Sequence, residues 1–494
     1  MADPRRSPRS GRPRPGKPRS GKPRPGKAAT GAKADAARLL AFDVLVAVRE
    51  QDAYTNLLLA AMLRERGITG RDAAFATELV SATVRRRGTY DAVLAACVDR
   101  PLSKVDPAVL DALRLGSHQL LAMRVPTHAA VSTTVDLVRQ RVGHGPAGFV
   151  NAVLRKVAAH DLEGWVRRVA PDPATDPVGF ASVAYSHPPW VVQALDTALD
   201  AALGPARSAS DLEALLTADN ASPKVTLVAR PGLSTVEELV EAGGTASAVS
   251  PYAVELPGGD PALVAAVAEG RAGVQDEGSQ LVALALAAAE IEGRDERWLD
   301  MCAGPGGKSA LLASVAAGRG AHVLASERQV HRAGLVRRST AAASAGLTGV
   351  IAADGTMPAW RPGTFDRVLV DAPCSGLGAL RRRPESRWRR TPSDLEVLVP
   401  LQESLLRSAI EAVRPGGVVA YVTCSPVVAE TSEVVERVLA DRSDVTLEDA
   451  VPLFSGVPDL QADEARLPGT VQLWPHRHGT DAMFFALLRR RPER

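Results

Sequence analysis

Aromatic residues make up only 4% of the 494-residue chain, so its cores must be built from Ala, Leu and Val. Cysteine is also scarce: four residues stand alone at positions 97, 302, 374 and 424, without a CxxC pair or a nearby histidine cluster. This pattern argues against a disulfide framework and against zinc, and it is typical of a reducing cytoplasm. No run of about 18 apolar residues occurs, so no membrane-spanning helix is expected. The basic N-terminus lacks the apolar stretch of a signal peptide.

Positive charge is concentrated at the N-terminus. Residues 1–33 hold eleven Lys or Arg and one acid, Asp3, which gives this segment a net charge of +10. The whole chain has a net charge of +3, so the remaining residues carry −7. The segment nearly repeats itself, as SGRPRPGKPR at 10–19 and SGKPRPGKAA at 20–29. Pro, Gly and Arg at this density cannot bury a core, so the sequence predicts a disordered basic tail.

The tail has two open interpretations: it contacts RNA phosphates, or it is a solubilising linker. If it contacts RNA, deleting residues 1–33 should weaken RNA binding mainly at low salt, because fewer counterions are then released on binding. Filter-binding titrations at several salt concentrations measure this slope. A salt dependence equal to that of the full chain would contradict the RNA-contact role.

The length predicts two or three domains. Residues 34–160 have a helical pattern throughout, with Leu40, Val44 and Val48 recurring at i, i+4 and i+8 on one apolar face. Gly67 and Gly88 stand where helix C-caps are expected. Further helices are predicted at 107–122, 128–142 and 146–159. No strand-like alternation interrupts them, so this part is predicted to be an all-α bundle.

Strands appear only after this bundle. Residues 161–270 are predicted to form linker helices and a small α+β module, with a strand at 223–230 and a short helix at 236–242. From 271 to 494 strands and helices alternate, which predicts a doubly wound, mostly parallel sheet with ligands at the carboxyl ends of its strands. The predicted strands are RWLDMC (297–302), HVLASE (322–327), GVIAAD (349–354), FDRVLVD (365–371) and GVVAYVTC (417–424).

The first of these strands runs into the glycine-rich turn CAGPGGKS (302–309), followed by a helix. The glycines let the backbone approach a ligand, and the helix N-terminus and Lys308 favour an anionic group. Glu327 and Asp354 end the next two strands, where they could bind ribose hydroxyls and an adenine amino group. Alternatively, each acid only caps the following helix. Together these features favour a nucleoside-type cofactor, and the glycine spacing disfavours a Walker P-loop.

Two cysteines follow the next two strands, in DAPCSGLG (371–378) and TCSP (423–426). Single free cysteines are usually inert core residues, but two at adjacent strand ends favour chemistry. A thiolate that adds to carbon 6 of cytosine makes carbon 5 nucleophilic enough to accept a methyl group, and Asp371 is placed to assist at the ring nitrogen. From the residue pattern alone, Cys374 and Cys424 cannot be ranked as nucleophile.

Several motifs together resemble the RNA 5-methylcytosine methyltransferases of the NOL/Nop/Sun group. The helical segments DAAFATELVSATVRRRGTYD and GFVNAVLRKVA resemble a NusB-type RNA-binding domain, which makes the bacterial Sun/Fmu branch, of the 16S rRNA cytosine-C5 methyltransferase B type, the nearest. The resemblance covers about residues 35–490 and is weakest across 195–270. The other motifs are CAGPGGKS, DAPCSGLG, RRRPESRWRR, YVTCSP, QDEGSQLVALAL (275–286) and PHRHGTDAMFFALLRR (475–490).

The resemblance implies site residues and partners. Cys424 takes the nucleophile position, Cys374 helps product release and Asp371 assists catalysis, although DNA cytosine methyltransferases use the Pro-Cys site as nucleophile. The implied S-adenosylmethionine site consists of Cys302, Ala303, Gly304, Pro305, Gly306, Gly307, Lys308, Glu327, Arg332, Asp354 and Asp371. Glu327 departs from the Asp that this branch often has, which lengthens the reach to the ribose. The implied partner is small-subunit rRNA, bound by the helical domain and the α+β module of a cytoplasmic monomer without a metal.

Arginines surround Trp388 after the Pro-Cys loop, in RRRPESRWRR (381–390). Guanidinium groups beside an aromatic ring favour contact with a flipped base and its phosphates, whereas the alternative is a solvated basic loop with Trp388 in the core. Two other functions compete with rRNA methylation. One is an RNA-binding or antitermination module with an inactive methyltransferase fold, which should have lost a cysteine, Asp371 or the glycine turn. The other is the same chemistry on tRNA or DNA.

Overall fold

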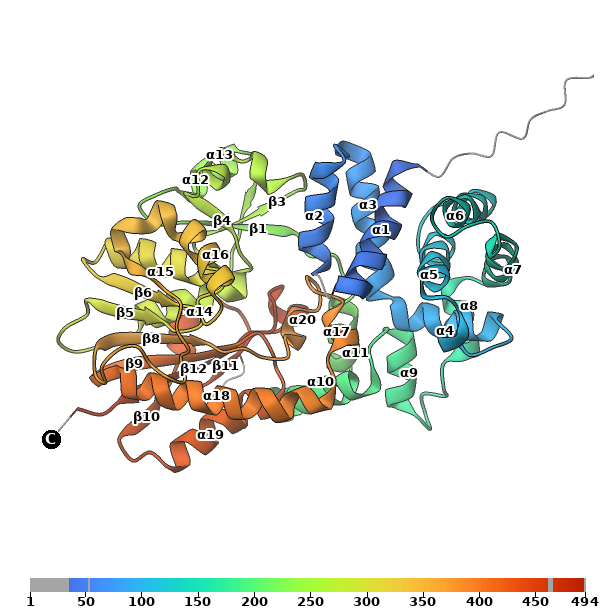
Figure 1. The fold of residues 1–494 in the computed structure, drawn as a ribbon. Helices are drawn as coiled ribbons and strands as arrows, with labels where there is room; N and C mark the ends of the chain where they lie inside the picture. Colours follow the sequence, from blue (N-terminus) through green and yellow to red (C-terminus); the bar gives the residue numbers. More distant parts are fainter. Residues whose placement is uncertain (1–34, 52–53, 461–464, 493–494) are drawn as a thin grey trace, which may run out of the picture.

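The computed structural model describes residues 35–51, 54–460 and 465–492, so the predicted tail lies outside the described residues. A helical bundle comes first (Figure 1), and its core contains Leu40, Leu79, Leu94 and Leu113. Asp106 begins one of the helices, because its carboxylate accepts from the backbone N–H groups of Ala108 and Val109. The helices are α1 (Ala36–Gln51), α2 (Thr55–Glu65), α3 (Gly70–Arg85), α4 (Arg87–Cys97), α5 (Pro107–Leu121), α6 (Thr127–Arg141), α7 (Ala147–Val157) and α8 (Leu162–Val169).

One of the two predicted caps in this bundle is wrong. Gly67 follows α2 with φ +62°, as a helix-ending glycine should. Gly88 instead lies inside α4, where a Cβ atom would come within 2.5 Å of the Trp388 ring. Its small size therefore serves the packing of a segment 300 residues away in the chain, which no local pattern can reveal.

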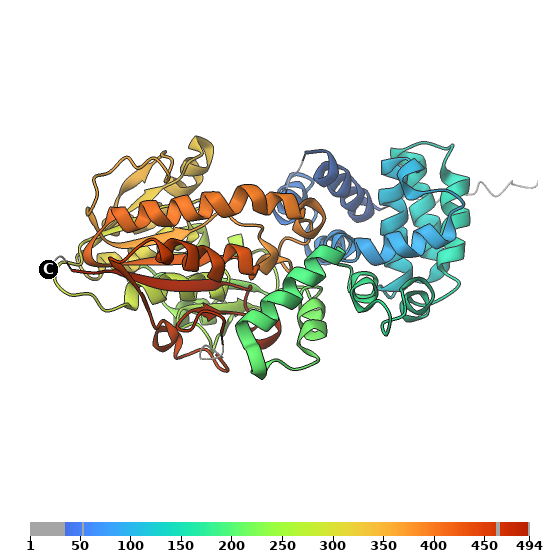
Figure 2. The ribbon, with the colours of Figure 1, turned by 90° about the horizontal axis from the view of Figure 1, so that it is seen from below.

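Three helices connect the bundle to the sheets: α9 (Pro177–Ala184), α10 (Pro189–Leu203) and α11 (Asp211–Ala218). Seen from below, the green helices lie between the blue bundle and the orange and red part of the chain (Figure 2). Leu195 and Leu199 of α10 share a core with Leu377 and Trp474 from the C-terminal domain. The linker helices are thus packed against the far end of the chain.

A small antiparallel sheet follows, with the strand order β2-β3-β1-β4. Its strands are β1 (Val225–Ala229), β2 (Thr245–Ala246), β3 (Ala253–Leu256) and β4 (Ala272–Val274), with the short helices α12 (Val236–Glu241) and α13 (Ala265–Ala268). Leu227, Leu239 and Val254 form its core. The predicted strand at 223–230 and the helix at 236–242 correspond to β1 and α12.

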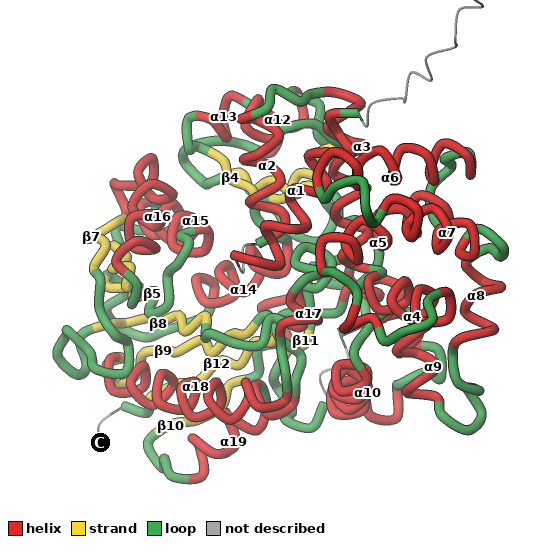
Figure 3. Tube along the Cα trace, turned by 45° about the vertical axis from the view of Figure 1, so that its right-hand side comes forward, coloured by secondary structure: helices red, strands yellow, loops and turns green. Residues whose placement is uncertain are grey.

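The large sheet has the order β10-β12-β9-β8-β5-β6-β7, and β5 to β9 run parallel to one another. Its strands are β5 (Arg297–Asp300), β6 (His322–Ser326), β7 (Leu347–Ile351), β8 (Phe365–Asp371), β9 (Val413–Thr423), β10 (Val445–Glu448) and β12 (Phe484–Arg490), and β11 (Val471–Gln472) pairs with β12. Strand β12 inserts antiparallel between β9 and β10, which the sequence pattern did not predict. The strands lie away from the helical bundle (Figure 3).

Helices cover both faces of this sheet. On one face α14 (Glu277–Ala288) and α15 (Gly307–Ala317) pack against Trp298 and Leu369, and α16 (Val330–Thr340) lies beside α15. On the other, α18 (Pro392–Ala412) and α19 (Ser432–Ala440) pack against Leu299 and Val368. The chain proceeds outward from β5 in one direction and returns through β8 in the other, so the switch point lies between β5 and β8. Across the described residues, no helix combines the length and apolar character needed to cross a membrane.

Candidate active site

The glycine-rich turn lies at this switch point, between β5 and α15. Gly306 has φ +110°, and a Cβ there would come within 2.9 Å of the backbone of Val336 on α16. A Cβ on Gly304 would collide with the carboxylate of Glu327, which follows β6. Both glycines are therefore needed for the turn to pass close to its neighbours, with the N-terminus of α15 open above the strand ends.

Glu327 is bound to this turn. One of its carboxylate oxygens accepts from the Gly304 N–H at 3.1 Å, the other from the Gln329 N–H at 2.9 Å, and the side chain is nearly buried. Arg332 completes the link, since its guanidinium donates to the Gly304 carbonyl at 2.7 Å and lies 3.6 Å from the Glu327 carboxylate. Because a carboxylate has about four acceptor positions, Glu327 keeps capacity for a ligand's hydroxyl groups.

Asp354 does not cap a helix, because a turn follows it and no helix lies between β7 and β8; its carboxylate holds that turn instead. One carboxylate oxygen accepts from the Thr356 N–H at 3.0 Å and from the Thr356 hydroxyl at 2.7 Å. These hydrogen bonds lower the pKa of Asp354. The other oxygen lies 3.5 Å from the Arg328 guanidinium, and the side chain is about one-third exposed. The carboxylate thus stands at the end of β7, ionised and accessible.

Three other residues predicted to bind the cofactor, Cys302, Ala303 and Pro305, belong to the glycine-rich turn. Ala303 is buried, and its N–H donates to the Ser326 carbonyl at 2.9 Å. The Pro305 carbonyl accepts from the Ser339 hydroxyl of α16 at 3.1 Å. Burial raises the pKa of the Cys302 thiol well above its usual value. Cys302 is therefore a neutral group in the turn.

Lys308 lies on the first turn of α15 and donates to the Asp371 carboxylate, at the end of β8, over 2.8 Å. Burial opposes the charge of Lys308, but the adjacent carboxylate outweighs it and raises the lysine's pKa. The structure thus joins the glycine-rich turn to the predicted catalytic edge through a single ion pair.

The structure brings the two predicted catalytic cysteines together, with their Sγ atoms 3.4 Å apart. Cys374 follows β8 and Cys424 follows the adjacent strand β9. The hydrogen bond from Cys374 lowers the pKa of Cys424, with further help from the Arg383 and Lys308 cations. The same hydrogen bond raises the pKa of Cys374. The hydrogen bond between the two sulfurs thus shifts their pKa values in opposite directions.

Known proteins were compared with this chain. A family model described as 16S rRNA methyltransferase RsmB/F matches residues 286–489, and a NusB family model matches residues 35–159. A putative methyltransferase of Mycobacterium tuberculosis (strain H37Rv) is 52% identical over 457 residues, which cover 92% of this chain and 97% of the relative. The probable ribosomal RNA small subunit methyltransferase B of Bacillus subtilis (strain 168) is 31% identical, over 92% of this chain and 99% of that protein. The chain belongs to the RsmB/F methyltransferase family.

Solved structures agree with the fold of this RsmB/F chain. The crystal structure of PH0851 has a TM-score of 0.73 at 20% identity and covers 92% of this chain and 98% of its own. A methyltransferase homolog from Pyrococcus horikoshii has a TM-score of 0.50 at 20% identity, over 65% of this chain and 100% of its own. The family models and relatives confirm the predicted family and its NusB-like domain, and the fold of the helical and doubly wound domains is confirmed as well.

Sequence reasoning missed two buried carboxylates in the RsmB/F site. Asp300 ends β5 and accepts from the Ser309 hydroxyl of α15 at 2.6 Å, and burial raises its pKa to about 7. Glu430 lies fully buried six residues after Cys424 and binds the segments of both cysteines. Asp300 could have been predicted as a site residue, because it is an acid at the last position of a strand. Glu430 could not, because its partners come from distant parts of the chain.

The RNA-contact hypothesis for the arginine segment is wrong for its buried members, Arg381 and Arg387. Arg381 and the partly buried Arg382 pair with Asp481, at 3.4 and 3.2 Å. Arg387 is fully buried, and its guanidinium donates to the Asn220 side chain at 2.9 Å and to the Asp219 carbonyl at 3.1 Å. These three guanidinium groups are bound to protein partners and join three parts of the chain.

Trp388 in the same segment is also bound to protein. Its indole N–H donates to the Val84 carbonyl of α3 at 2.9 Å, and its ring lies against Gly88 of α4. The alternative is therefore confirmed in part: Trp388 is partly buried and packs against the core of the bundle, but the arginines around it do not form a solvated loop. Arg383 differs from its neighbours, because it is exposed and its guanidinium lies 4.8 Å from the centre of the Tyr54 ring.

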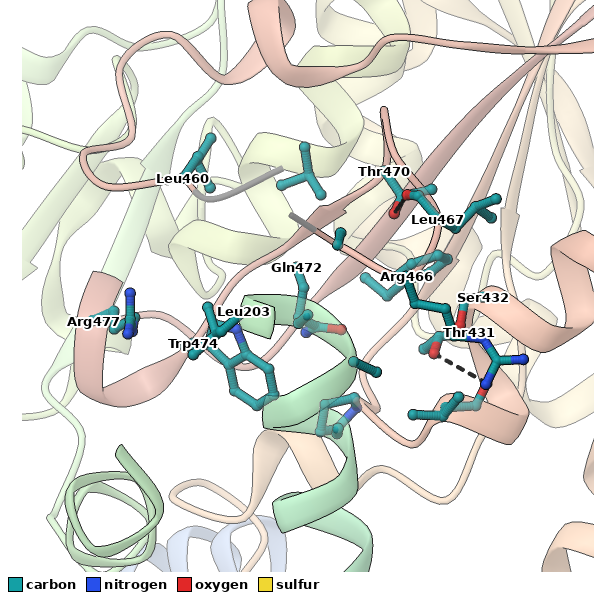
Figure 4. Close-up of a pocket in the computed structure, with 18 of the residues that line it drawn as sticks. Leu203, Thr431, Ser432, Leu460, Arg466, Leu467, Thr470, Gln472, Trp474 and Arg477 are labelled. Carbon is teal, nitrogen blue, oxygen red and sulfur yellow. Dashed lines mark hydrogen bonds between the residues drawn. The ribbon is translucent and has the colours of Figure 1, made fainter. Parts of the chain in front are cut away.

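A pocket of about 40 Å³ lies away from the cysteines of the RsmB/F chain, between α10 and the segment that leads to β12. Leu203, Thr431, Leu467 and Trp474 are among its lining residues (Figure 4). Its lining includes neither cysteine nor any residue of the glycine-rich turn. This cavity is therefore separate from the candidate active site.

Proposed function

We propose that the chain transfers a methyl group from S-adenosylmethionine to carbon 5 of a cytosine in small-subunit rRNA. The observation that carries this proposal is the 3.4 Å cysteine pair at neighbouring strand ends, joined to a glycine-rich turn through Lys308 and Asp371. Family membership and the relatives' rRNA activity support the choice of RNA, and the NusB match over residues 35–159 accompanies it.

The residues present fit S-adenosylmethionine. Two buried acceptor atoms near the turn, Asp300 Oδ1 and Gln275 Oε1, lack a hydrogen-bond partner in the protein, and Glu327 has spare acceptor capacity. Gly304 to Lys308 and the start of α15 would face the amino-acid part, Glu327 the ribose and Asp354 the adenine. When bound, S-adenosylmethionine supplies an electrophilic methyl group.

Replacing Glu327 by glutamine should weaken S-adenosylmethionine binding. The amide oxygen can still accept from the Gly304 N–H, although the Gln329 N–H then loses its acceptor, and hydroxyl groups bind a neutral amide less strongly than a carboxylate. A charge-assisted hydrogen bond contributes about 2 kcal/mol, so the Kd should rise about 30-fold. Isothermal titration calorimetry measures it.

A matched control for Glu327 is Glu292→Gln, at an exposed loop position before β5 on the opposite edge of the sheet. It should leave the Kd unchanged. Equal affinities for wild type and Glu327→Gln would remove Glu327 from the proposed site.

The chain's own residues account for the chemistry at cytosine. The Cys424 thiolate forms a bond to carbon 6, and the electron pair of the C5–C6 double bond becomes available at carbon 5. Asp371 lies beside the cysteines to accept a hydrogen bond from the cytosine edge, and Lys308, 2.8 Å away, donates a hydrogen bond to the ring nitrogen while keeping its proton. After transfer, the carbon 5 proton passes to solvent, the double bond re-forms and the S–C6 pair returns to Cys424. The Cys374 thiol then donates a hydrogen bond to the departing thiolate.

Bisulfite sequencing of RNA from cells with and without the gene tests the proposed reaction. One 5-methylcytosine position in small-subunit rRNA should disappear with the gene and return with the wild-type protein. If a 5-methylcytosine is lost from tRNA and rRNA is unchanged, the substrate is tRNA and the proposed chemistry still holds. An unchanged methylation map in all RNA would contradict the proposed function.

A further inference from the structure

The carboxylate of Glu430 connects the segments that carry the two cysteines. One oxygen accepts from the Ser375 N–H at 2.7 Å and from the Gln402 amide at 3.1 Å. The other accepts from the Ser375 hydroxyl at 2.6 Å and from the Ser425 hydroxyl at 2.7 Å. Ser375 and Ser425 directly follow Cys374 and Cys424, and their hydroxyl oxygens lie 3.0 Å apart. One side chain therefore sets the spacing of both cysteine loops.

Hydrogen bonds rather than an ion pair hold the Glu430 carboxylate. Its side chain is fully buried, and within the described ranges no Lys, Arg or His forms an ion pair with it. Four hydrogen-bond donors stabilise the carboxylate instead, as a buried charge requires. Arg390 contacts the same loop from another direction, since its guanidinium donates to the Ser375 carbonyl at 3.2 Å.

The charged groups around the cysteines are distributed unevenly. Asp371 of β8 acts on Cys424, where it disfavours a thiolate, and Arg383 of the arginine segment and Lys308 of α15 favour one. Glu430 acts on Cys374, where its charge favours the thiol. Its carboxylate accepts from the backbone N–H of Ser375, the residue after Cys374, so among two sulfurs 3.4 Å apart its charge favours the proton on Cys374.

We propose that Glu430 is a positioning residue that holds the two cysteine loops together and keeps the shared proton on Cys374, so that Cys424 is the thiolate. This inference deepens the proposed function, on which its catalytic meaning rests. Glu430 touches neither reacting sulfur, and acts through Ser375, Ser425 and its charge. It thereby determines which of two similar thiols attacks and which assists release.

Cysteine alkylation tests the inference without using methylation. Full-length wild type, Glu430→Gln and the control Glu433→Gln are treated with iodoacetamide across a pH series, and Cys374 and Cys424 peptides are quantified by mass spectrometry. Glu433 lies on α19, three residues away, and pairs with Arg437 and Arg466. In the wild type Cys424 should react first. In Glu430→Gln the ratio of Cys374 to Cys424 modification at neutral pH should rise about tenfold, as expected for a one-unit change in relative acidity. The Glu433→Gln control should match wild type.

Two outcomes would overturn the inference. One is an unchanged ratio in a Glu430→Gln protein whose circular dichroism and melting match wild type. The other needs no variant: equal or faster modification of Cys374 in the wild type contradicts the assigned proton position, even if Glu430→Gln fails to fold. A chain that shows the expected alkylation pattern but methylates no cytosine would refute the proposed function and leave the electrostatic role of Glu430 in place.

Discussion

Cys424→Ala should lower the rate of methyl transfer to rRNA by about 10⁴-fold or more, a loss typical of a missing catalytic nucleophile. Without the Cys424 sulfur nothing adds to carbon 6, and carbon 5 remains too weak a nucleophile. Cys374 follows a different strand end from Cys424, so its sulfur is not expected to take over the attack from the same position. Transfer of radiolabelled methyl groups to a small-subunit rRNA transcript measures the rate.

The control for Cys424→Ala is Cys97→Ala, because Cys97 is buried in the helical bundle away from the active site. It should retain methyl transfer, with at most a small loss of stability. Appreciable activity in Cys424→Ala, at more than about one-hundredth of the wild-type rate, would exclude Cys424 as the nucleophile.

Cys374→Ala should instead accumulate a covalent complex between the protein and RNA. Cys424 can still attack carbon 6 and the methyl group can still be transferred, but the departing thiolate loses the hydrogen bond that Cys374 donates across 3.4 Å. Breaking the S–C6 bond therefore becomes the slow step. The complex should appear as a band of reduced mobility in denaturing gels after incubation with RNA and S-adenosylmethionine.

The double variant Cys374→Ala/Cys424→Ala separates this effect from non-specific trapping, since it should form no such band. If Cys424→Ala forms the stable complex and Cys374→Ala does not, the two roles are reversed. That result would also contradict the proposal that Cys424 is the thiolate and Cys374 the thiol.

Much of the methyltransferase domain could be predicted because its signals are local. Apolar strands, the glycine-rich turn and the acids after β6 and β7 follow one another along the chain, and the doubly wound order then places their carboxyl ends at one edge. Cys374 and Cys424, 50 residues apart, meet for the same reason. Parallel neighbouring strands bring their ends together without any specific side-chain contact.

Features that depend on distant partners could not be predicted. Arg381 pairs with Asp481 across 100 residues, and Arg387 binds Asn220 across 167. A cluster of arginines beside a tryptophan has the same composition whether it faces RNA or a carboxylate of its own chain. Gly88 and Glu430 likewise serve neighbours that approach only after folding. The sequence contains these residues without showing their partners.

Docking of the arginine segment has a consequence for how the active site is organised. The chain from Cys374 to Trp388 begins at the end of β8 and reaches the helical bundle, where the Trp388 indole N–H binds the Val84 carbonyl. A loop attached at both ends to rigid elements loses most of its conformational freedom during folding. The loop that carries Cys374 is then ordered before RNA binds. Ordering this loop therefore reduces the free energy of RNA binding only slightly. Without the helical bundle, the loop that carries Cys374 should therefore be more mobile, even though both cysteines lie in the methyltransferase domain.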